Sequence, residues 1–301
     1  MRVLFVLFMI AISAKAEIVY DVRYALATNN VALADSLVQQ YRTQRGVTPE
    51  LIEALSWLGR GALAANQLDK AEAYAEQTQQ LVAQELKKHP LDSEEHLPMA
   101  LGASIETEAQ VMNARGERAQ ALAYLRKELA LYRSTSIRAR IQKNINLLDL
   151  VGKPAPALDE REFLGPKPPT LLSLRGKPVL LFFWAHWCGD CKLERRDISQ
   201  IRREFATQGL TILTPTQRYG YVAGGQDANP QDELKYIDEI RNKYYLDLVD
   251  VPAPISEENF KLYGASTTPT LVLIDRHGVV RMYHPGRMPI DELRAEVRKL
   301  L

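Results

Sequence analysis

The chain has 301 residues, which is long enough to bury a sizeable core and to form two domains. Hydrophobic residues make up 46% and charged residues 25%, as in an ordinary globular protein, and the net charge of +1 argues against a surface for nucleic acid or anionic membranes. The only two cysteines lie in one motif, so none is left for a structural disulfide framework.

Residues 1–16 have the pattern of a secretory signal peptide. Arg2 is followed by an apolar run to Ile12, and the small-x-small pattern at residues 14–16 predicts cleavage before Glu17. The alternative is an uncleaved membrane anchor, but this run of about ten residues is short of the roughly 20 that span a bilayer. The sequence therefore predicts an exported protein, periplasmic if the source is bacterial, with no membrane span after cleavage.

Residues 17–150 are predicted to form a helical domain, because they are rich in Ala, Leu, Gln and Glu and have few β-branched runs. The segment Asn66–Tyr74 resembles Gly116–Tyr124: in both, a turn residue precedes a helix with Ala and Tyr at matching offsets. Residues 30–37 are a weaker third copy. This pattern resembles tetratricopeptide-type hairpins, with a loop at residues 87–98 that lengthens one repeat, and a generic helical bundle is the alternative. Either arrangement would present a surface to a protein partner.

A composition shift at residues 151–156 marks the start of a second domain over residues 151–301. Strand and helix patterns alternate there, which predicts a central sheet with helices on both faces, parallel where helices connect the strands and ending in an antiparallel hairpin. The expected strands are residues 179–184, 210–213, 248–251, 270–274 and 279–283, and the expected helices are residues 188–207, 230–244, 256–263 and 289–300.

The motif Cys188-Gly-Asp-Cys191 follows the first of these strands and opens the next helix. Two cysteines at this spacing lie one helical turn apart, close enough to form a disulfide with little backbone movement. The helix N-terminus also favours a thiolate at Cys188. The motif therefore predicts a redox dithiol. The helix is expected to bury a face made of Leu193, Ile198, Ile201 and Phe205.

The run Phe-Phe-Trp-Ala-x-Trp at residues 182–187, together with the order of elements, resembles the thioredoxin fold. Further stretches resemble the TlpA/ResA-like branch of exported thiol–disulfide oxidoreductases, at residues 152–158, 174–181, 263–264, 267–270 and 273–278. The resemblance covers residues 151–301. It implies an α/β thioredoxin fold that acts on protein thiols and disulfides, receives electrons from an upstream donor protein, and uses no cofactor beyond the Cys188–Cys191 disulfide.

The resemblance also implies roles for individual residues. Cys188 would attack the partner's disulfide, and Cys191 would resolve the mixed disulfide that forms. Thr268–Pro269 would be a cis peptide bond beside the thiols, where Pro269 shapes the site and Thr268 and Trp187 meet an extended substrate segment. The loop at residues 219–225 is expected at the substrate surface from its position in the chain.

Three more residues would tune this chemistry. Glu194 would take a proton from Cys191, although a solvated charge on the first helical turn is the alternative. His186 would stabilise the Cys188 thiolate when protonated, although a surface-facing histidine is the alternative. The Asp190 carboxylate opposes thiolate formation, which makes the pair more reducing and predicts a reductant of protein disulfides.

A different class of function is a metal-binding module, such as a copper chaperone on the same fold. Cys188, Cys191 and His186 supply three potential soft ligands, and His277 and His284 are distant candidates for the fourth ligand of a closed site. A peroxiredoxin-like site is a poorer match, because that chemistry wants a lone activated cysteine rather than a pair.

Overall fold

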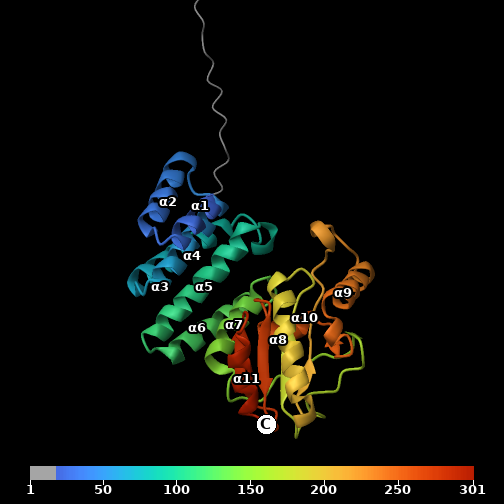
Figure 1. The fold of residues 1–301 in the computed structure, drawn as a ribbon. Helices are drawn as coiled ribbons and strands as arrows, with labels where there is room; N and C mark the ends of the chain where they lie inside the picture. The colour runs from blue at the N-terminus through green and yellow to red at the C-terminus, as the bar shows by residue number, and fades with distance from the viewer. Residues whose placement is uncertain (1–17) are drawn as a thin grey trace, which may run out of the picture. The chain divides into compact units, whose positions relative to one another are not determined.

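The computed structural model describes residues 18–301, so the predicted signal peptide at residues 1–16 lies outside the described residues. Helices occupy the first part of the described chain and an α/β part follows, as Figure 1 shows and as the sequence predicted. Two compact units divide the chain, one ending at Val111 and the other beginning at Met112. Within residues 18–301, no helix combines the length and the apolar character that crossing a membrane requires.

The first unit is built from antiparallel helices. Its core is made of buried residues that recur at the helical spacing of one face on each of the first three helices: Ile18, Val22 and Ala25, then Ala34 and Val38, then Leu51, Leu55 and Leu58. The helices of this unit are α1 (Ile18–Ala27), α2 (Val31–Arg45), α3 (Pro49–Ala64), α4 (Leu68–Glu85) and most of α5 (His96–Ala114), with a short 3₁₀ turn at Leu91–Ser93 between α4 and α5.

The predicted repeat has a structural counterpart in three turns between helices. Asn29, Asn66 and Gly116 have positive φ angles of 57°, 56° and 84°. In each turn the next amide donates to a carbonyl five residues back, at 2.8 Å from residue 30, 2.8 Å from residue 67 and 2.9 Å from residue 117. The equivalent of Asn66 and Gly116 is Asn29, so the turn of the weak copy lies one residue before its predicted start at residue 30. The assignment to tetratricopeptide-type hairpins stays a prediction.

The second unit contains a four-stranded sheet in the order β3-β2-β5-β6. β2 is parallel to β3, and β5 is antiparallel to both β2 and β6; Phe183 pairs with Thr270 and Val179 with Ile274. The strands are β2 (Val179–Phe183), β3 (Thr211–Leu213), β5 (Thr270–Ile274) and β6 (Val280–Pro285).

Two details of the predicted sheet are wrong. Residues 248–251 form no strand: a 3₁₀ turn at Leu246–Leu248 is followed by β4 (Ala253–Pro254), which pairs with β1 (Phe163–Leu164) outside the main sheet. β5 is also not parallel to β3, although helices connect them. With one strand missing from the sheet, the chain enters β5 from the opposite end, beside the carboxyl end of β2.

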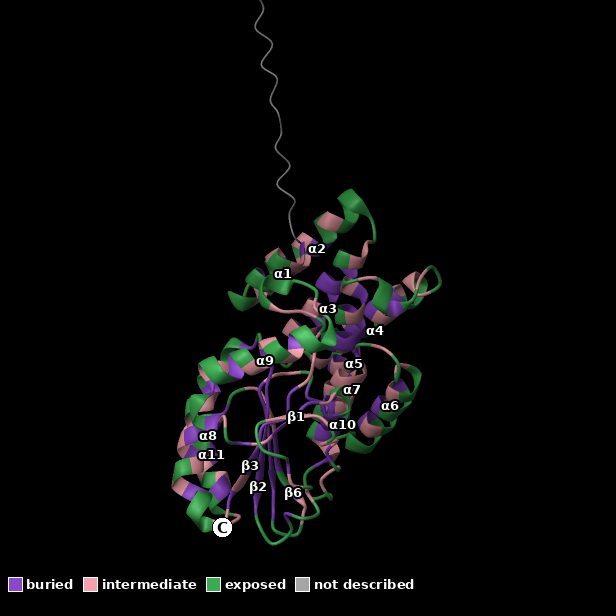
Figure 2. Cartoon of the chain, turned by 90° about the vertical axis from the view of Figure 1, so that its right-hand side faces the viewer, coloured by how far each residue is buried: buried purple, intermediate pink, exposed green. Residues whose placement is uncertain are grey.

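Alternate residues of β2 face opposite layers, as the period-two geometry of a strand requires. Leu180 and Phe182 pack in the cluster that includes α8 (Gly189–Phe205), α9 (Pro230–Tyr244) and α11 (Ile290–Arg298). Leu181 and Phe183 pack in the cluster that includes α10 (Glu257–Tyr263). Figure 2 shows the buried strands between these two helical layers.

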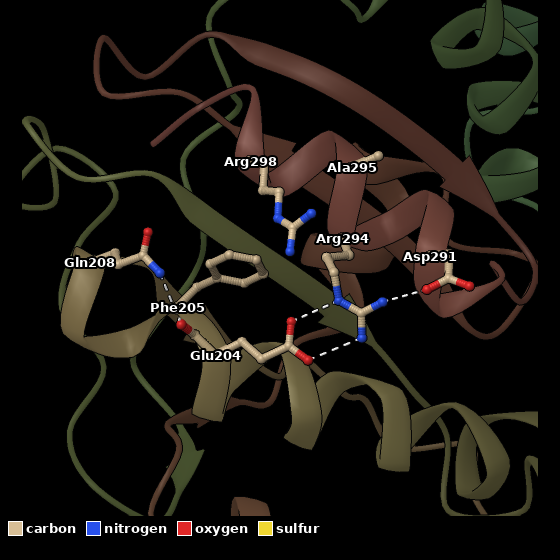
Figure 3. A pocket seen from close by; sticks show the side chains of 7 residues that line it. All are labelled: Glu204, Phe205, Gln208, Asp291, Arg294, Ala295 and Arg298. Atoms are coloured by element: carbon tan, nitrogen blue, oxygen red, sulfur yellow. Dashed lines mark hydrogen bonds and ion pairs between the residues drawn. The ribbon is translucent and has the colours of Figure 1, made fainter.

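An ion-pair cluster joins α11 to α8. Arg294 Nε lies 2.7 Å from one Glu204 oxygen and Nη2 lies 3.0 Å from the other, while Nη1 contacts Asp291 on its own helix. Figure 3 shows these contacts in a shallow surface pocket that Arg298 also lines. The hydrogen bond from Arg294 lowers the pKa of Glu204 to about 2, so this carboxylate is charged at neutral pH.

Helices α6 (Arg118–Leu131) and α7 (Arg138–Asp149) belong to the second unit, where α7 packs against α10 and β6. Gly264, which ends α10 at a φ of +59°, lies against α7: a Cβ added there would lie 2.6 Å from the Cα of Lys143. The predicted domain boundary after residue 150 stays a prediction.

Candidate active site

The two cysteines sit where β2 leads into α8. Cys188 caps the helix, and its Sγ accepts a hydrogen bond from the Cys191 amide at 3.0 Å. The two sulfurs form a disulfide, with Cα atoms 5.3 Å apart. Cys188 is 3% exposed and Cys191 is fully buried, so Cys188 is the sulfur that solvent and a partner can reach. The helix N-terminus places its positive end at this sulfur, which favours a thiolate after reduction.

The Thr268–Pro269 peptide bond is cis, as expected. The carbonyl oxygen of Thr268 lies 3.4 Å from Cys188 Sγ, although the two residues are 80 positions apart in the chain. The sheet explains this proximity, because the pairing of Phe183 with Thr270 places the start of β5 beside the carboxyl end of β2. The Thr268 hydroxyl is buried and has no hydrogen-bond partner among the described residues.

Trp187 and Asp190 form the exposed rim of this site. Trp187 is 49% exposed, and its ring meets the ring of Tyr219 edge-on, with centroids 5.5 Å apart. Asp190 is exposed in the first turn of α8. An exposed aromatic ring and a reactive sulfur at adjacent positions provide a surface that a substrate segment can contact.

Glu194 is fully buried, which excludes the solvated alternative. It lies on the buried face of α8 with Cys191, Ile198 and Ile201, whereas the predicted face residue Leu193 is 49% exposed. Burial raises the pKa of Glu194, and hydrogen bonds from the Met288 amide and the Arg287 side chain oppose this shift. A carboxyl group with a raised pKa, one helical turn from Cys191, is suited to exchange a proton with that thiol.

His186 is only 1% exposed, so the surface-facing alternative is wrong. Its Nε2 lies 3.4 Å from Oε1 of Glu233, which is also 1% exposed. Burial lowers the pKa of His186, and the nearby Glu233 carboxylate opposes this shift. The imidazole is therefore neutral at neutral pH and is directed to Glu233 in α9, an arrangement different from the thiolate contact that the sequence suggested.

Sequence reasoning missed Glu233, although a signal for it exists. Glu233 lies on the same buried face of α9 as Ile237 and Ile240, so a carboxylate stands where the helical spacing calls for an apolar residue; Arg241 is also buried on this face. The same pattern marks Glu194 on α8. A carboxylate on the apolar face of an amphipathic helix is a candidate for a buried pair, because burying it unpaired would cost several kcal/mol.

The candidate ligands of the metal-binding alternative are not brought together. His186 faces Glu233, and His284 Nε2 lies 3.0 Å from the Arg287 carbonyl oxygen. His277 lies in the turn after β5, at the end of the sheet opposite to Cys188. Within residues 18–301, no three His, Cys, Asp or Glu side chains are grouped closely enough to hold a metal ion.

Residues 171–301 match the thioredoxin-like domain family. The chain is 32% identical over 156 residues to a thiol:disulfide interchange protein DsbE from Pseudomonas fluorescens biotype C, and the match covers 50% of this chain and 78% of the relative. The chain belongs to the thioredoxin-fold thiol–disulfide oxidoreductases. A DsbE from Escherichia coli K12 is 28% identical over 153 residues, which covers 50% of this chain and 74% of that relative.

A solved structure of a thiol:disulfide interchange protein of the thioredoxin family from Chlorobium tepidum is also similar. It is 20% identical, with a TM-score of 0.39, and the match covers 50% of this chain and 98% of that structure. The sequence matches to the thioredoxin-like domain and to DsbE cover about half of this thiol–disulfide oxidoreductase, the half that carries Cys188 and Cys191.

Proposed function

We propose that this protein is an exported oxidoreductase of the TlpA/ResA-like branch that reduces disulfide bonds in other proteins. The observation that carries the proposal is the Cys188–Cys191 pair at the start of α8, with Cys188 Sγ 3.4 Å from the Thr268 carbonyl beside a cis proline. This arrangement leaves one reactive sulfur next to a strand end where an extended segment can lie.

The proposed reaction is a pair of thiol–disulfide exchanges. The Cys188 thiolate attacks one sulfur of the substrate disulfide, a new S–S bond forms, and the other substrate sulfur leaves and takes a proton. Cys191 then loses its proton to Glu194 and attacks Cys188, which releases the second substrate thiol. The substrate gains two electrons and two protons, and Cys188–Cys191 becomes a disulfide that an upstream donor protein reduces again.

Two features support the direction toward reduction and the location. Asp190 places a carboxylate in the first turn of α8 close to the Cys pair, and negative charge there disfavours the thiolate and so makes the pair more reducing. The pattern of residues 1–16 supports export. The helices before residue 150 are proposed to bind a protein partner.

Trapping of mixed disulfides tests this proposal. Cys191→Ser lets Cys188 attack a substrate but removes the resolving thiol, so we expect covalent adducts with exported proteins that disappear on addition of dithiothreitol. Cys188→Ser is the matched control and should trap none. A Cys191→Ser protein that forms no adducts in its native compartment, and whose Cys188 resists alkylation, would refute the proposed reaction.

A further inference from the structure

We propose that the buried His186–Glu233 pair positions the loop of residues 219–228 against Trp187, and that this loop forms one wall of the surface that selects protein substrates. His186 and Glu233 then act as positioning residues for the exchange reaction at Cys188. The proposal rests on the proposed function in one respect, namely that a protein segment docks beside Cys188.

One carboxylate connects three segments of the chain. Glu233 Oε1 accepts a hydrogen bond from the Tyr219 amide and Oε2 accepts one from the Gly220 amide at 2.9 Å, while His186 Nε2 lies 3.4 Å from Oε1. Glu233 itself is in the first turn of α9. The segment before Cys188, the loop and α9 therefore meet at one buried carboxylate, whose two hydrogen bonds to backbone amides fix the start of the loop.

The charges at this point are balanced without a protonated histidine. The His186 imidazole is neutral because burial lowers its pKa, and the positive charge of nearby Lys192 favours the same form. His186 Nε2 lies 3.4 Å from Glu233 Oε1 without meeting hydrogen-bond geometry, so the ring packs against the carboxylate and does not donate to it. The two backbone amides and the N-terminus of α9 stabilise the negative charge of Glu233. The pair is therefore suited to hold the loop in place over the neutral pH range.

Contacts between aromatic rings connect His186 to Trp187 at the exposed rim of the active site. The imidazole of His186 is enclosed edge-on by Tyr219, Tyr221 and Tyr236, with ring centroids 5.5, 5.3 and 5.3 Å away. Tyr219 in turn meets Trp187 edge-on at 5.5 Å. Edge-to-face contacts of this kind have a preferred geometry, so a displaced Tyr219 would leave Trp187, the neighbour of Cys188, without its lateral support.

The loop is closed on itself, so its anchor decides its position as a whole. The Ala228 amide donates to the Gly220 carbonyl at 2.9 Å, and the Val222 amide donates to the Gln226 carbonyl at 2.8 Å. Its tip at residues 223–227 is exposed. With Trp187 it offers half-buried aromatic edges beside Cys188. The chemistry that fits them is a protein disulfide on an extended segment with an apolar or aromatic side chain next to its cysteine.

A comparison of two substrates tests the proposal. For Glu233→Gln and His186→Gln, we expect the KM for a protein disulfide, insulin, to rise about tenfold with kcat changed less than about twofold, because uniform binding is lost. The rate with a small disulfide, hydroxyethyl disulfide, should change less than about twofold, because so small a substrate does not contact the loop of residues 219–228. The double variant should be no worse than either single variant, because one unit is broken in each.

The matched controls are Glu239→Gln, an exposed position on α9, and His277→Gln, an exposed position at the far end of the sheet; neither should alter the KM. Folded Glu233→Gln and His186→Gln variants with an unchanged KM for insulin would overturn the proposal. An equal loss of rate with insulin and with hydroxyethyl disulfide would also overturn it, because the pair would then affect the reactivity of Cys188 and Cys191 and not substrate docking. Should these variants not fold, Tyr219→Leu keeps the backbone contact with Glu233, removes the ring and carries the same expected KM change.

A failure of the proposed function has a different signature. A wild-type protein that reduces neither insulin nor hydroxyethyl disulfide would refute the proposed reductant activity. The positioning role is then tested by measuring how fast the protein's own disulfide is reduced. In that case we expect the variants to slow reduction of the Cys188–Cys191 disulfide by reduced thioredoxin, a protein dithiol, and to leave its reduction by dithiothreitol unchanged; equal effects on both would overturn the positioning role.

Discussion

Glu194 Oε1 accepts a hydrogen bond from the Met288 amide at 3.3 Å, which joins the first turns of α8 to the segment between β6 and α11. Oε2 accepts a second one from Arg287 Nε, also at 3.3 Å. Both contacts favour the charged carboxylate, but burial of the whole side chain outweighs them and raises the pKa of Glu194. Its protonation is therefore poised closer to neutral pH than that of an exposed glutamate.

Glu194→Gln is expected to slow resolution of the mixed disulfide by roughly tenfold or more at neutral pH, because general base catalysis by a positioned group is lost. The wild-type rate should rise as pH increases through the raised pKa of Glu194, since only the deprotonated form accepts a proton. The variant should lack this rise, so the two rates converge in acid. Stopped-flow rates from pH 4 to 8 measure this, with Glu239→Gln, an exposed carboxylate on α9, as the control; a Glu194→Gln variant with the wild-type pH profile would contradict the role.

The same substitution should stabilise the fold at neutral pH. A raised pKa in the folded state means that the native protein binds this proton more tightly than the unfolded chain, so the stability from Glu194 is present in acid and is lost as pH rises through the folded pKa. Glutamine carries no charge and escapes that loss. Thermal unfolding should show the variant gaining a few degrees in Tm relative to wild type between pH 4 and pH 7. A difference in Tm between Glu194→Gln and wild type that stays constant or becomes smaller from pH 4 to pH 7 would contradict the claim that burial raises the pKa of Glu194.

Asp190→Pro should make the reduction potential of the Cys188–Cys191 pair less negative, because it removes a carboxylate that opposes the thiolate. A change on the order of 30 mV corresponds to a tenfold shift in the exchange equilibrium. Proline is tolerated in the first turn of a helix, so α8 should persist. Equilibration with glutathione buffers gives the potential, and Asp190→Asn should shift it in the same direction by charge alone. A more negative potential in Asp190→Pro would refute the proposed direction.

Gly264→Ala is expected to destabilise the second unit by on the order of 3 kcal/mol, through a clash with the backbone of α7 added to an unfavourable positive φ. For a unit of this size that is a loss of roughly 10 °C in Tm. Gly209→Ala is the matched control: Gly209 also follows a helix at positive φ, but a Cβ there meets nothing within 4 Å, so it should lose only about a third as much. Equal losses in both would mean that α7 does not pack tightly at Gly264.

Several elements were predictable because their signals are local. Asn229 and Pro230 mark the start of α9, and the Asn229 side chain caps the helix by accepting from Gln231 and Asp232. The apolar run of β2 and the Cys-x-x-Cys spacing predicted the strand, the turn and the disulfide. By contrast, residues 248–251 have three apolar side chains and looked like a strand. Whether such a run forms a strand depends on partners in the sheet that lie far away in sequence.

The sequence by itself determined the redox motif, the α/β class of residues 151–301 and the helical character of the part before it. Each of these features depends on the spacing and type of residues that are close together in the chain. Only the tertiary structure decided the environments around the motif. The antiparallel entry of β5 brings Thr268 to Cys188. The packing of α9 buries His186 beside Glu233, whereas the sequence offered a contact with the thiolate or a position at the surface. Burial and long-range pairing set charge state and proximity, and neither can be read from local spacing alone.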